Sequence, residues 1–325
     1  MPVEDDGTIG NDSVNVSAVD TSRPFRRADA VEAGLSPRDF RGSRFRRLFR
    51  GVYIDATRRP DRHDRIAAGL LLHPEGARAS HLSAASLYGL PVPDHSDVHI
   101  SVVDPKDRRW QPGLKPHVSP PGQGIRQVDG LPASEPIRMF VELASVLNLV
   151  DLVVVGDAMS RILGLRAGEL RASLIKIRDY WSPAARAAAV FVRDEVDSPM
   201  ESRLRMLLVL AGLPEPVINL KLRNGSGEVI LRFELSYPAY KVAVEYEGRQ
   251  HAESPQQWER DIDRREFLDR DGWRIVLVTA RGIYNEPWRT LDRVVSTLRE
   301  RGANLAVVSN DWRPFFPGRP SIRPA

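Results

Sequence analysis

The residues that point most directly to chemistry are three glutamates in the last third of the chain. Glu234, Glu245 and Glu247 lie in apolar runs that predict neighbouring strands. Successive side chains of a strand alternate between its two faces, so Glu245 and Glu247 share a face, and a hairpin would set Glu234 beside them. Like-charged carboxylates repel one another unless water, interleaved bases or a divalent cation separates them. Hard oxygen ligands suit Mg²⁺ or Mn²⁺, so the pattern predicts a site for one of these ions.

Two further residues have both a chemical and a structural interpretation. Glu201 comes three residues after Ser198 in a capping-box sequence, where it either completes the helix cap or joins the metal site. His251 follows the third predicted strand, as a candidate acid or base or as a loop residue without a role. A solvated strand face is the simpler explanation for Glu234 and Glu247.

The elements that must position these residues follow from hydrophobic spacing and turn residues. A helix is predicted to start at Ser198 and to end at Gly212. Alternation and turn signals predict the rest in the following order. They are strands over 217–223, 229–236 and 241–247, a helix over 255–270, a strand over 273–279 and a helix over 287–299. The resulting order, α-β-β-β-α-β-α, indicates a mixed α/β (α+β) fold.

Residues 198–300 resemble the PD-(D/E)XK nuclease superfamily, and more closely the domains related to very-short-patch-repair endonucleases. The resemblance rests on "SPMESRLR", "LRFELSYPAYKVAVEYEGRQH", "RDIDRR" and "DGWRIVLVT". It implies a restriction-endonuclease-like core that hydrolyses phosphodiester bonds with Mg²⁺ or Mn²⁺. The positions that match the family's functional residues are Glu201, Glu234, Glu245, Glu247, His251, Asp261 and Arg264.

Two positions depart from this family pattern. Glu234 stands where the family has a metal-binding Asp, and Glu247 stands where the superfamily has a lysine that helps the attacking water. Lys241 is predicted to face the same way as Glu245 and is a candidate substitute. Asp261 and Arg264 lie three residues apart on the predicted helix, so they either support the site or pair on the helix surface. An inactive nuclease fold is therefore the alternative to an active one.

The other chemical signal is a run of arginines near the amino terminus. Residues 23–50 contain nine arginines against three acids. A helix before Gly34, a second helix opened by Ser36-Pro37 and a strand pair over 45–54 together predict a winged helix-turn-helix. The second helix would carry Arg38 and Arg41, and the strand pair or its surroundings Arg44, Arg46, Arg47 and Arg50. These arginines are candidates for DNA phosphate contacts, with a solvated basic face as the alternative.

The first half of the chain resembles the AbiEi-type antitoxins and transcriptional regulators of type IV toxin–antitoxin systems. The matching stretches are "FRRADAVEAGLSPRDFRGSRFRRLFRGVYIDA", "SHLSAASLYGL" and "PIRMFVELA", within about residues 23–160. The resemblance implies a winged helix that binds operator DNA, and a protein partner such as a toxin is a further candidate. The alternative function is thus a regulator or antitoxin whose nuclease fold no longer cleaves.

Composition sets the remaining limits. The chain has 325 residues, 42% of them hydrophobic and 28% charged, with a net charge of +4 and no cysteine. These values exclude disulfides and thiolate metal sites, and they favour a folded cytoplasmic protein without a membrane segment. Five histidines between residues 73 and 117 show no metal-binding spacing on a helix and are predicted to be structural. Five segments are expected: a disordered tail over 1–22, the winged helix over 23–60, a mixed α+β region over 61–197, the endonuclease-like domain over 198–302 and a tail over 303–325.

Overall fold

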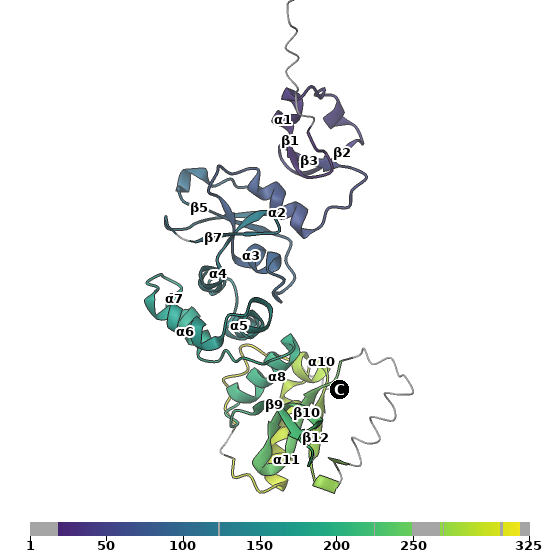
Figure 1. Cartoon of the computed structure of the whole chain (residues 1–325), viewed down its shortest axis with the longest axis vertical. Helices are drawn as coiled ribbons and strands as arrows, with labels where there is room; N and C mark the ends of the chain where they lie inside the picture. The colour runs from purple at the N-terminus through teal and green to yellow at the C-terminus, as the bar shows by residue number, and fades with distance from the viewer. Residues whose placement is uncertain are drawn as a thin grey trace, which may run out of the picture. The chain divides into compact units, whose positions relative to one another are not determined.

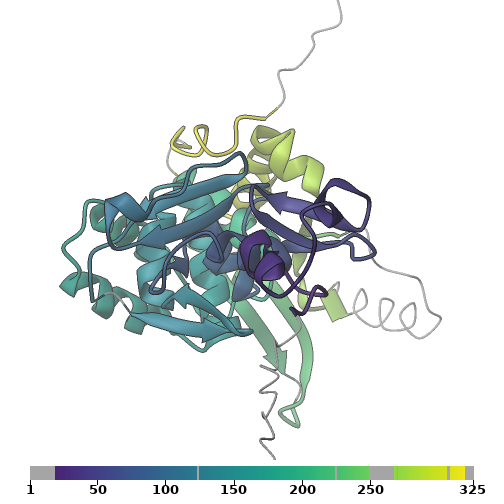
Figure 2. The ribbon, with the colours of Figure 1, turned by 90° about the horizontal axis from the view of Figure 1, so that it is seen from above.

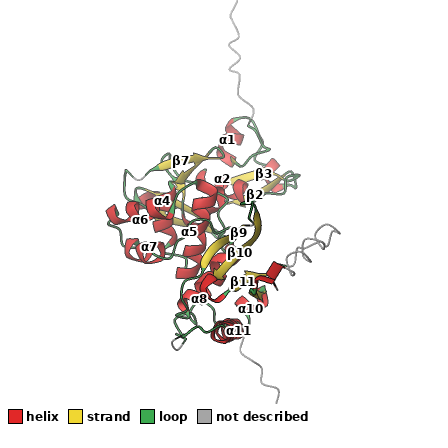
Figure 3. Ribbon diagram, turned by 60° about the horizontal axis from the view of Figure 1, so that its bottom comes forward, coloured by secondary structure: helices red, strands yellow, loops and turns green. Residues whose placement is uncertain are grey.

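The computed structural model describes residues 19–122, 124–223, 225–248, 267–268, 270–305 and 308–318. It is an α+β protein, as the sequence predicts, with helices and strands interspersed along the chain (Figure 3). Contacts divide the chain into two compact units. Unit 1 comprises the described parts of residues 1–79 and 96–121, and unit 2 those of residues 80–95 and 122–325. None of the helices within the described ranges combines the length and apolar character that a bilayer crossing requires.

Unit 1 begins with a small three-stranded antiparallel sheet, ordered β1-β3-β2. Its elements are β1 (Phe25–Arg26), α1 (Arg27–Glu32), β2 (Phe45–Phe49) and β3 (Val52–Asp55). Three aromatic rings form most of its core: Phe25 and Phe40 both pack on Phe45, with centroid separations of 5.2 and 5.4 Å. Aromatic burial of this kind lets so short a segment hold a defined hairpin. The predicted strand pair over 45–54 is therefore confirmed.

The predicted second helix of this segment is wrong. One 3₁₀ turn, η1 (Asp39–Arg41), takes its place. The carboxylate of Asp39 accepts a hydrogen bond from the Ser36 backbone N–H at 2.8 Å, and the Ser36 hydroxyl accepts one from the Arg38 N–H at 3.2 Å. Short polar side chains that bond the neighbouring backbone favour turns over helices, and Gly42 then leaves the turn in extended conformation. Arg38 and Arg41 are consequently presented by a turn.

The rest of unit 1 is a helix and a three-strand arrangement. Its elements are α2 (Arg62–Leu70), β4 (Arg78–Ala79), β5 (Val98–Val102), η2 (Pro105–Asp107) and β6 (Leu114–Val118). β5 pairs antiparallel with β4 and parallel with β6. Asp61 and Asp64 form a capping box at the start of α2. Gly69 permits close packing of α2, because a Cβ there would lie 2.9 Å from Cγ1 of Val98 on β5.

Unit 2 begins with helices and one hairpin. The elements are α3 (His81–Leu87), β7 (Ile125–Val128), β8 (Leu131–Ser134), α4 (Pro136–Leu143), α5 (Leu149–Leu163), α6 (Ala167–Lys176) and α7 (Ser182–Ala189). Most of α5 is buried, and it packs on α7 and on the helix that follows, α8 (Pro199–Leu210). This contact links the helical part to the sheet that carries the glutamates.

That sheet has four strands in the order β12-β11-β10-β9. The strands are β9 (Val217–Arg223), β10 (Val229–Tyr237), β11 (Val242–Tyr246) and β12 (Arg274–Val278), and helices α10 (Ala280–Tyr284) and α11 (Pro287–Glu300) follow. β9, β10 and β11 pair antiparallel in turn, whereas β12 runs parallel to β11. Figure 1 shows α8, α10 and α11 beside this sheet, and Figure 2 shows β9 and β10 as a long hairpin.

The predicted elements of this region agree closely with the observed ones. The helix from Ser198 and the four strands all occur within two residues of their predicted limits. Helix α10 is an addition that the sequence pattern does not predict. Most of the predicted helix over 255–270 lies outside the described residues; 267, 268 and 270 are helical.

Candidate functional site

Strand pairing sets two of the predicted glutamates side by side. Leu235 on β10 is paired with Val244 on β11 in an antiparallel register. One further step of that register puts Glu234 opposite Glu245, on the same face of the sheet. The backbone N–H of Tyr246 donates to Oε2 of Glu234 at 2.7 Å, which fixes this carboxylate at the end of β11.

Glu201 enters the same neighbourhood from α8. Ser198 caps this helix, with its hydroxyl accepting from the Glu201 N–H at 3.1 Å. The Glu201 carboxylate accepts from the Asp197 N–H at 3.2 Å, so the capping interpretation is correct in part. The side chain is only 4% exposed, however, and its charge acts on Glu234. We call Glu201, Glu234 and Glu245 the glutamate cluster.

The electrostatics of this cluster are unusual for surface carboxylates. Burial raises the pKa of Glu234 to about 7, and the nearby charges of Glu201 and Glu245 act in the same direction. Burial also raises the pKa of Glu201. Within the described ranges neither Glu201 nor Glu234 forms an ion pair with a base. Arg232, whose charge acts to lower the pKa of both, pairs with Asp197 at 2.6 Å. Acids of like charge are therefore held close together in a poorly solvated place.

Glu247 and Lys241, also predicted for the site, are both exposed, unlike the members of the glutamate cluster. Glu247 is exposed, and its backbone N–H donates to the carbonyl of Val278 at 2.8 Å. Lys241 precedes β11, at the opposite end from Glu245, with its Nζ 2.7 Å from the carbonyl oxygen of Asp271 and 3.3 Å from its carboxylate. The structure thus directs the Lys241 amine to Asp271 and not to the cluster. His251, Asp261 and Arg264 lie outside the described residues, so their roles stay predictions.

The cluster's donor set fits a hard divalent cation. Three carboxylates supply hard oxygen ligands, which suit Mg²⁺ or Mn²⁺. Their oxygens are not among the described groups in which three ligand atoms all lie within 4.8 Å of one another. A shared cation would therefore draw the carboxylates closer than they stand in this arrangement.

The predicted DNA-contacting arginines of unit 1 are all exposed; they are Arg38, Arg41, Arg44, Arg46, Arg47 and Arg50. We call this set the arginine-rich surface. Arg44 approaches Asp39 at 3.7 Å and lies over the ring of Phe45. Among the described residues the other five form no ion pair, so their charges are available to an anionic partner.

The sequence analysis missed a buried ion pair that supports α8. Arg205 is 0% exposed and contacts the carboxylate of Asp157 on α5 at 2.9 Å. The Ser202 hydroxyl donates to the same carboxylate at 2.7 Å, and Glu215 approaches Arg205 at 3.2 Å. Burial raises the pKa of Asp157, which the adjacent guanidinium opposes. An arginine between Leu204 and Met206 in an apolar stripe was the signal that could have revealed it.

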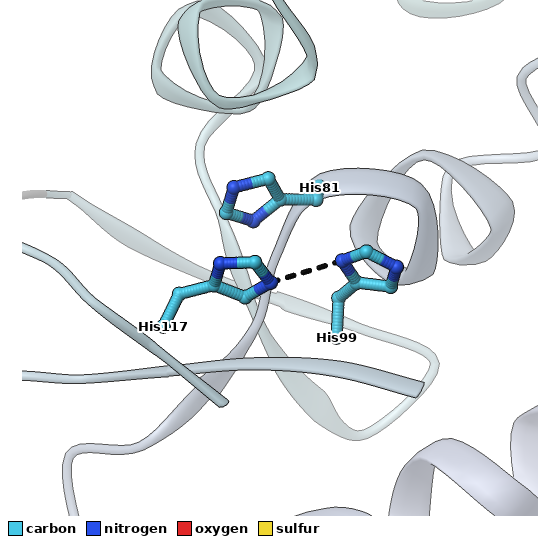
Figure 4. Close-up of side chains that lie close together, drawn as sticks. All are labelled: His81, His99 and His117. Carbon is cyan, nitrogen blue, oxygen red and sulfur yellow. Dashed lines mark hydrogen bonds between the residues drawn. The ribbon is translucent and has the colours of Figure 1, made fainter. Parts of the chain in front are cut away.

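Two of the histidines predicted to be structural form a pair in unit 1. His99 on β5 and His117 on β6 have Nδ1 and Nε2 3.0 Å apart, and their rings stack with centroids separated by 5.1 Å (Figure 4). Burial lowers the pKa of His117 to about 4, with a smaller contribution from the charge of Lys115. An N–H···N bond between imidazoles requires that at least one ring be neutral, and the lowered pKa keeps His117 neutral at pH 7.

Comparison with known proteins places the chain in a family. No family model matches the sequence. Two curated proteins of Mycobacterium tuberculosis do: "Uncharacterized protein MT2308" of strain CDC 1551 / Oshkosh and "Uncharacterized protein Rv2248" of strain ATCC 25618 / H37Rv. Each is 30% identical over 254 residues, which cover 78% of this chain and 92% of the relative. The chain therefore belongs to the same protein family as these two mycobacterial proteins.

Proposed function

We propose that this protein binds DNA through unit 1 and hydrolyses nucleic-acid phosphodiester bonds at the glutamate cluster, with Mg²⁺ or Mn²⁺. The observation that carries the proposal is the β10–β11 register that sets Glu234 opposite Glu245, where burial and the charge of Glu201 also raise the pKa of Glu234. Either a proton or a cation must offset the negative charge in this place. Carboxylate clusters that favour a divalent cation are typical of phosphoryl-group chemistry.

Each member of the cluster has a distinct part in this proposal. Glu234 and Glu245 would hold the ion from adjacent strands, and Glu201 would add its negative charge from α8. The Tyr246 N–H fixes one oxygen of Glu234, so the other oxygen remains for a ligand or a water. A bound divalent cation supplies an acidified water and offsets charge on the phosphate. His251 stays a candidate for proton transfer.

The arginine-rich surface supports DNA as the partner. Exposed guanidinium groups contact phosphates without a large desolvation cost, and they release condensed counterions when they do. A protein partner such as a toxin has no comparable support among the described residues.

The test is plasmid cleavage by the purified full-length chain with Mg²⁺ or Mn²⁺. Glu245→Gln keeps the shape of the side chain and removes its charge, so cleavage should fall at least about a hundredfold. Glu300→Gln is the matched control, because Glu300 is exposed at the end of α11 and should leave the rate unchanged. Equal cleavage by the wild type and Glu245→Gln would refute the proposal, as would no cleavage with either metal.

The second candidate function is a transcriptional regulator or antitoxin with an inactive nuclease fold. The position of Lys241 favours it, since the amine is held by Asp271 and brings no positive charge to the cluster. Under this alternative, Arg46→Ala and Arg38→Ala abolish operator binding, whereas Glu245→Gln leaves both binding and repression intact. Metal-dependent cleavage that Glu245→Gln eliminates would exclude it.

A further inference from the structure

A cluster of positive charge lines a pocket in unit 1. Its walls come from four separate stretches: the β1–α1 junction, the turn between β2 and β3, the segment after α2 and the segment after η2. The charged and polar side chains among them are Arg26, Arg27, Arg109 and His73, which we call the arginine pocket. The cavity is about 390 Å³, within the usual size range of small-molecule sites.

Backbone contacts hold the walls of the arginine pocket together. The Arg27 N–H donates to the carbonyl of Gly51 at 2.8 Å, which ties α1 to the β2–β3 turn. Nε of Arg26 donates to the carbonyl of Leu71, which ties β1 to the end of α2. The β2–β3 turn and the end of α2 are therefore both fixed to the β1–α1 junction.

Among the described residues, the three guanidinium groups of the pocket make no ion pair, and the carboxylate charge of Asp107 acts on His73 in the pocket wall. Arg27 lies over the ring of Phe40, and Arg109 donates to the carbonyls of Lys106 and Arg108. In the part of the chain that the structure describes, none of the three forms an ion pair, and no carboxylate lines the cavity. Guanidinium groups at the edge of one pocket can bind phosphate oxygens through charge-assisted hydrogen bonds.

His73 forms a buried part of the pocket wall. This side chain is 4% exposed, and its Nδ1 lies 2.9 Å from the carbonyl oxygen of Gly69, so Nδ1 carries the hydrogen. Nε2 is enclosed by protein, without a hydrogen-bond partner in the described structure. His73 therefore shapes the wall, and the arginines are the groups that a ligand in the pocket can reach.

We infer that the arginine pocket binds the phosphate group of a nucleotide-sized ligand, with the guanidinium groups on the phosphate. The phosphate ester comes either from a free nucleotide or from a DNA backbone that enters the cavity. This inference does not depend on the glutamate cluster or on cleavage.

Calorimetric titration of the full chain in EDTA tests the inference without divalent metal. Adenosine 5′-monophosphate and inorganic phosphate should bind saturably, and adenosine should not. Arg109→Gln should weaken the binding of adenosine 5′-monophosphate about tenfold. Arg108→Gln is the matched control: Arg108 is the exposed neighbour in the sequence, lies outside the pocket lining, and should change the affinity less than about twofold.

Competition with a short DNA duplex distinguishes the two phosphate sources. If the duplex displaces adenosine 5′-monophosphate and Arg109→Gln weakens duplex binding too, the backbone supplies the phosphate. If Arg109→Gln leaves duplex binding unchanged, a free nucleotide is the ligand. Three results would overturn the inference: no saturable binding of either phosphate probe, equal binding of adenosine, or an equal loss in Arg108→Gln.

Discussion

The glutamate cluster of unit 2 and the arginine-rich surface of unit 1 both gather charges of one sign, but burial gives them opposite properties. The arginines are exposed, so water and salt screen their repulsion and each keeps its charge. The glutamates are largely buried, so their repulsion appears as a raised pKa for Glu234. Under the proposed function, the exposed arginines meet a partner that approaches from solvent, whereas the buried glutamates hold a proton or a cation.

The largest effect should come from the buried ion pair that supports α8. Replacing Arg205 by Met leaves Asp157 buried without its counter-charge, and the free energy of unfolding should fall by about 3–5 kcal/mol. Urea denaturation measures it. Arg46→Met, the same change at an exposed arginine, should shift the free energy of unfolding by less than about 0.5 kcal/mol. Similar losses in both variants would erase the contrast between buried and exposed charge.

The next effect concerns pH and the glutamate cluster. The folded-state pKa of Glu234 is about 7, against an ordinary value of 4.5, so between these values the folded chain holds a proton that the unfolded chain has released. The free energy of unfolding should therefore fall as pH rises through this window, by about 1–2 kcal/mol after allowance for partial solvent exposure. Denaturation at several pH values should show the fall in the wild type and its loss in Glu234→Gln.

Mg²⁺ bound at the glutamate cluster should stabilise the folded chain, as the proton on Glu234 does at lower pH. At pH 8, where Glu234 is ionised, Mg²⁺ at ten times its dissociation constant should raise the free energy of unfolding by about 1.4 kcal/mol. Thermal denaturation with and without the ion measures this, with Glu300→Gln as a control that keeps the response. If Mg²⁺ does not change the free energy of unfolding of the wild type, or raises that of Glu245→Gln equally, the cluster does not bind the cation.

A smaller effect is expected for single exposed arginines. Arg46→Ala or Arg47→Ala should weaken DNA binding severalfold and reduce the slope of log K against log[salt] by about one, since each removes one phosphate contact. Fluorescence anisotropy with a labelled duplex at several salt concentrations gives the slope. Unchanged slopes in both variants would mean that the arginine-rich surface is only a solvated face.

Much of the fold could be predicted from the sequence, because its signals are local. The Ser198 cap, the alternating strands and the Asn224-Gly225 turn signal depend on neighbours within a few residues, and they predict the helix and hairpin of unit 2. The same logic failed at Ser36-Pro37, where Asp39 bonds back to the Ser36 N–H and closes a turn in place of a helix. Short polar residues support both outcomes, and only the tertiary context selects between them.

The candidate site could be predicted only in part. Alternation is enough to pair Glu234 with Glu245, because register is regular along a hairpin. It could not show that Lys241 stands before β11 in a left-handed conformation, at φ +50°, with its amine on Asp271. Nor could it show Arg205 reaching Asp157 on α5, since that contact joins residues far apart in the sequence.

The parallel pairing of β11 with β12 has a consequence for how the chain folds. β9, β10 and β11 can assemble successively through short connections, but β12 must return by a crossover before it can pair with β11. Contacts between distant residues form slowly because closing a long loop costs entropy. Until β12 arrives, β11 is an open sheet edge that exposes apolar residues and can pair with another molecule. Newly made chains are thus most prone to aggregation during this interval, and a substitution that delays β12 should lower the yield of native protein more than its equilibrium stability.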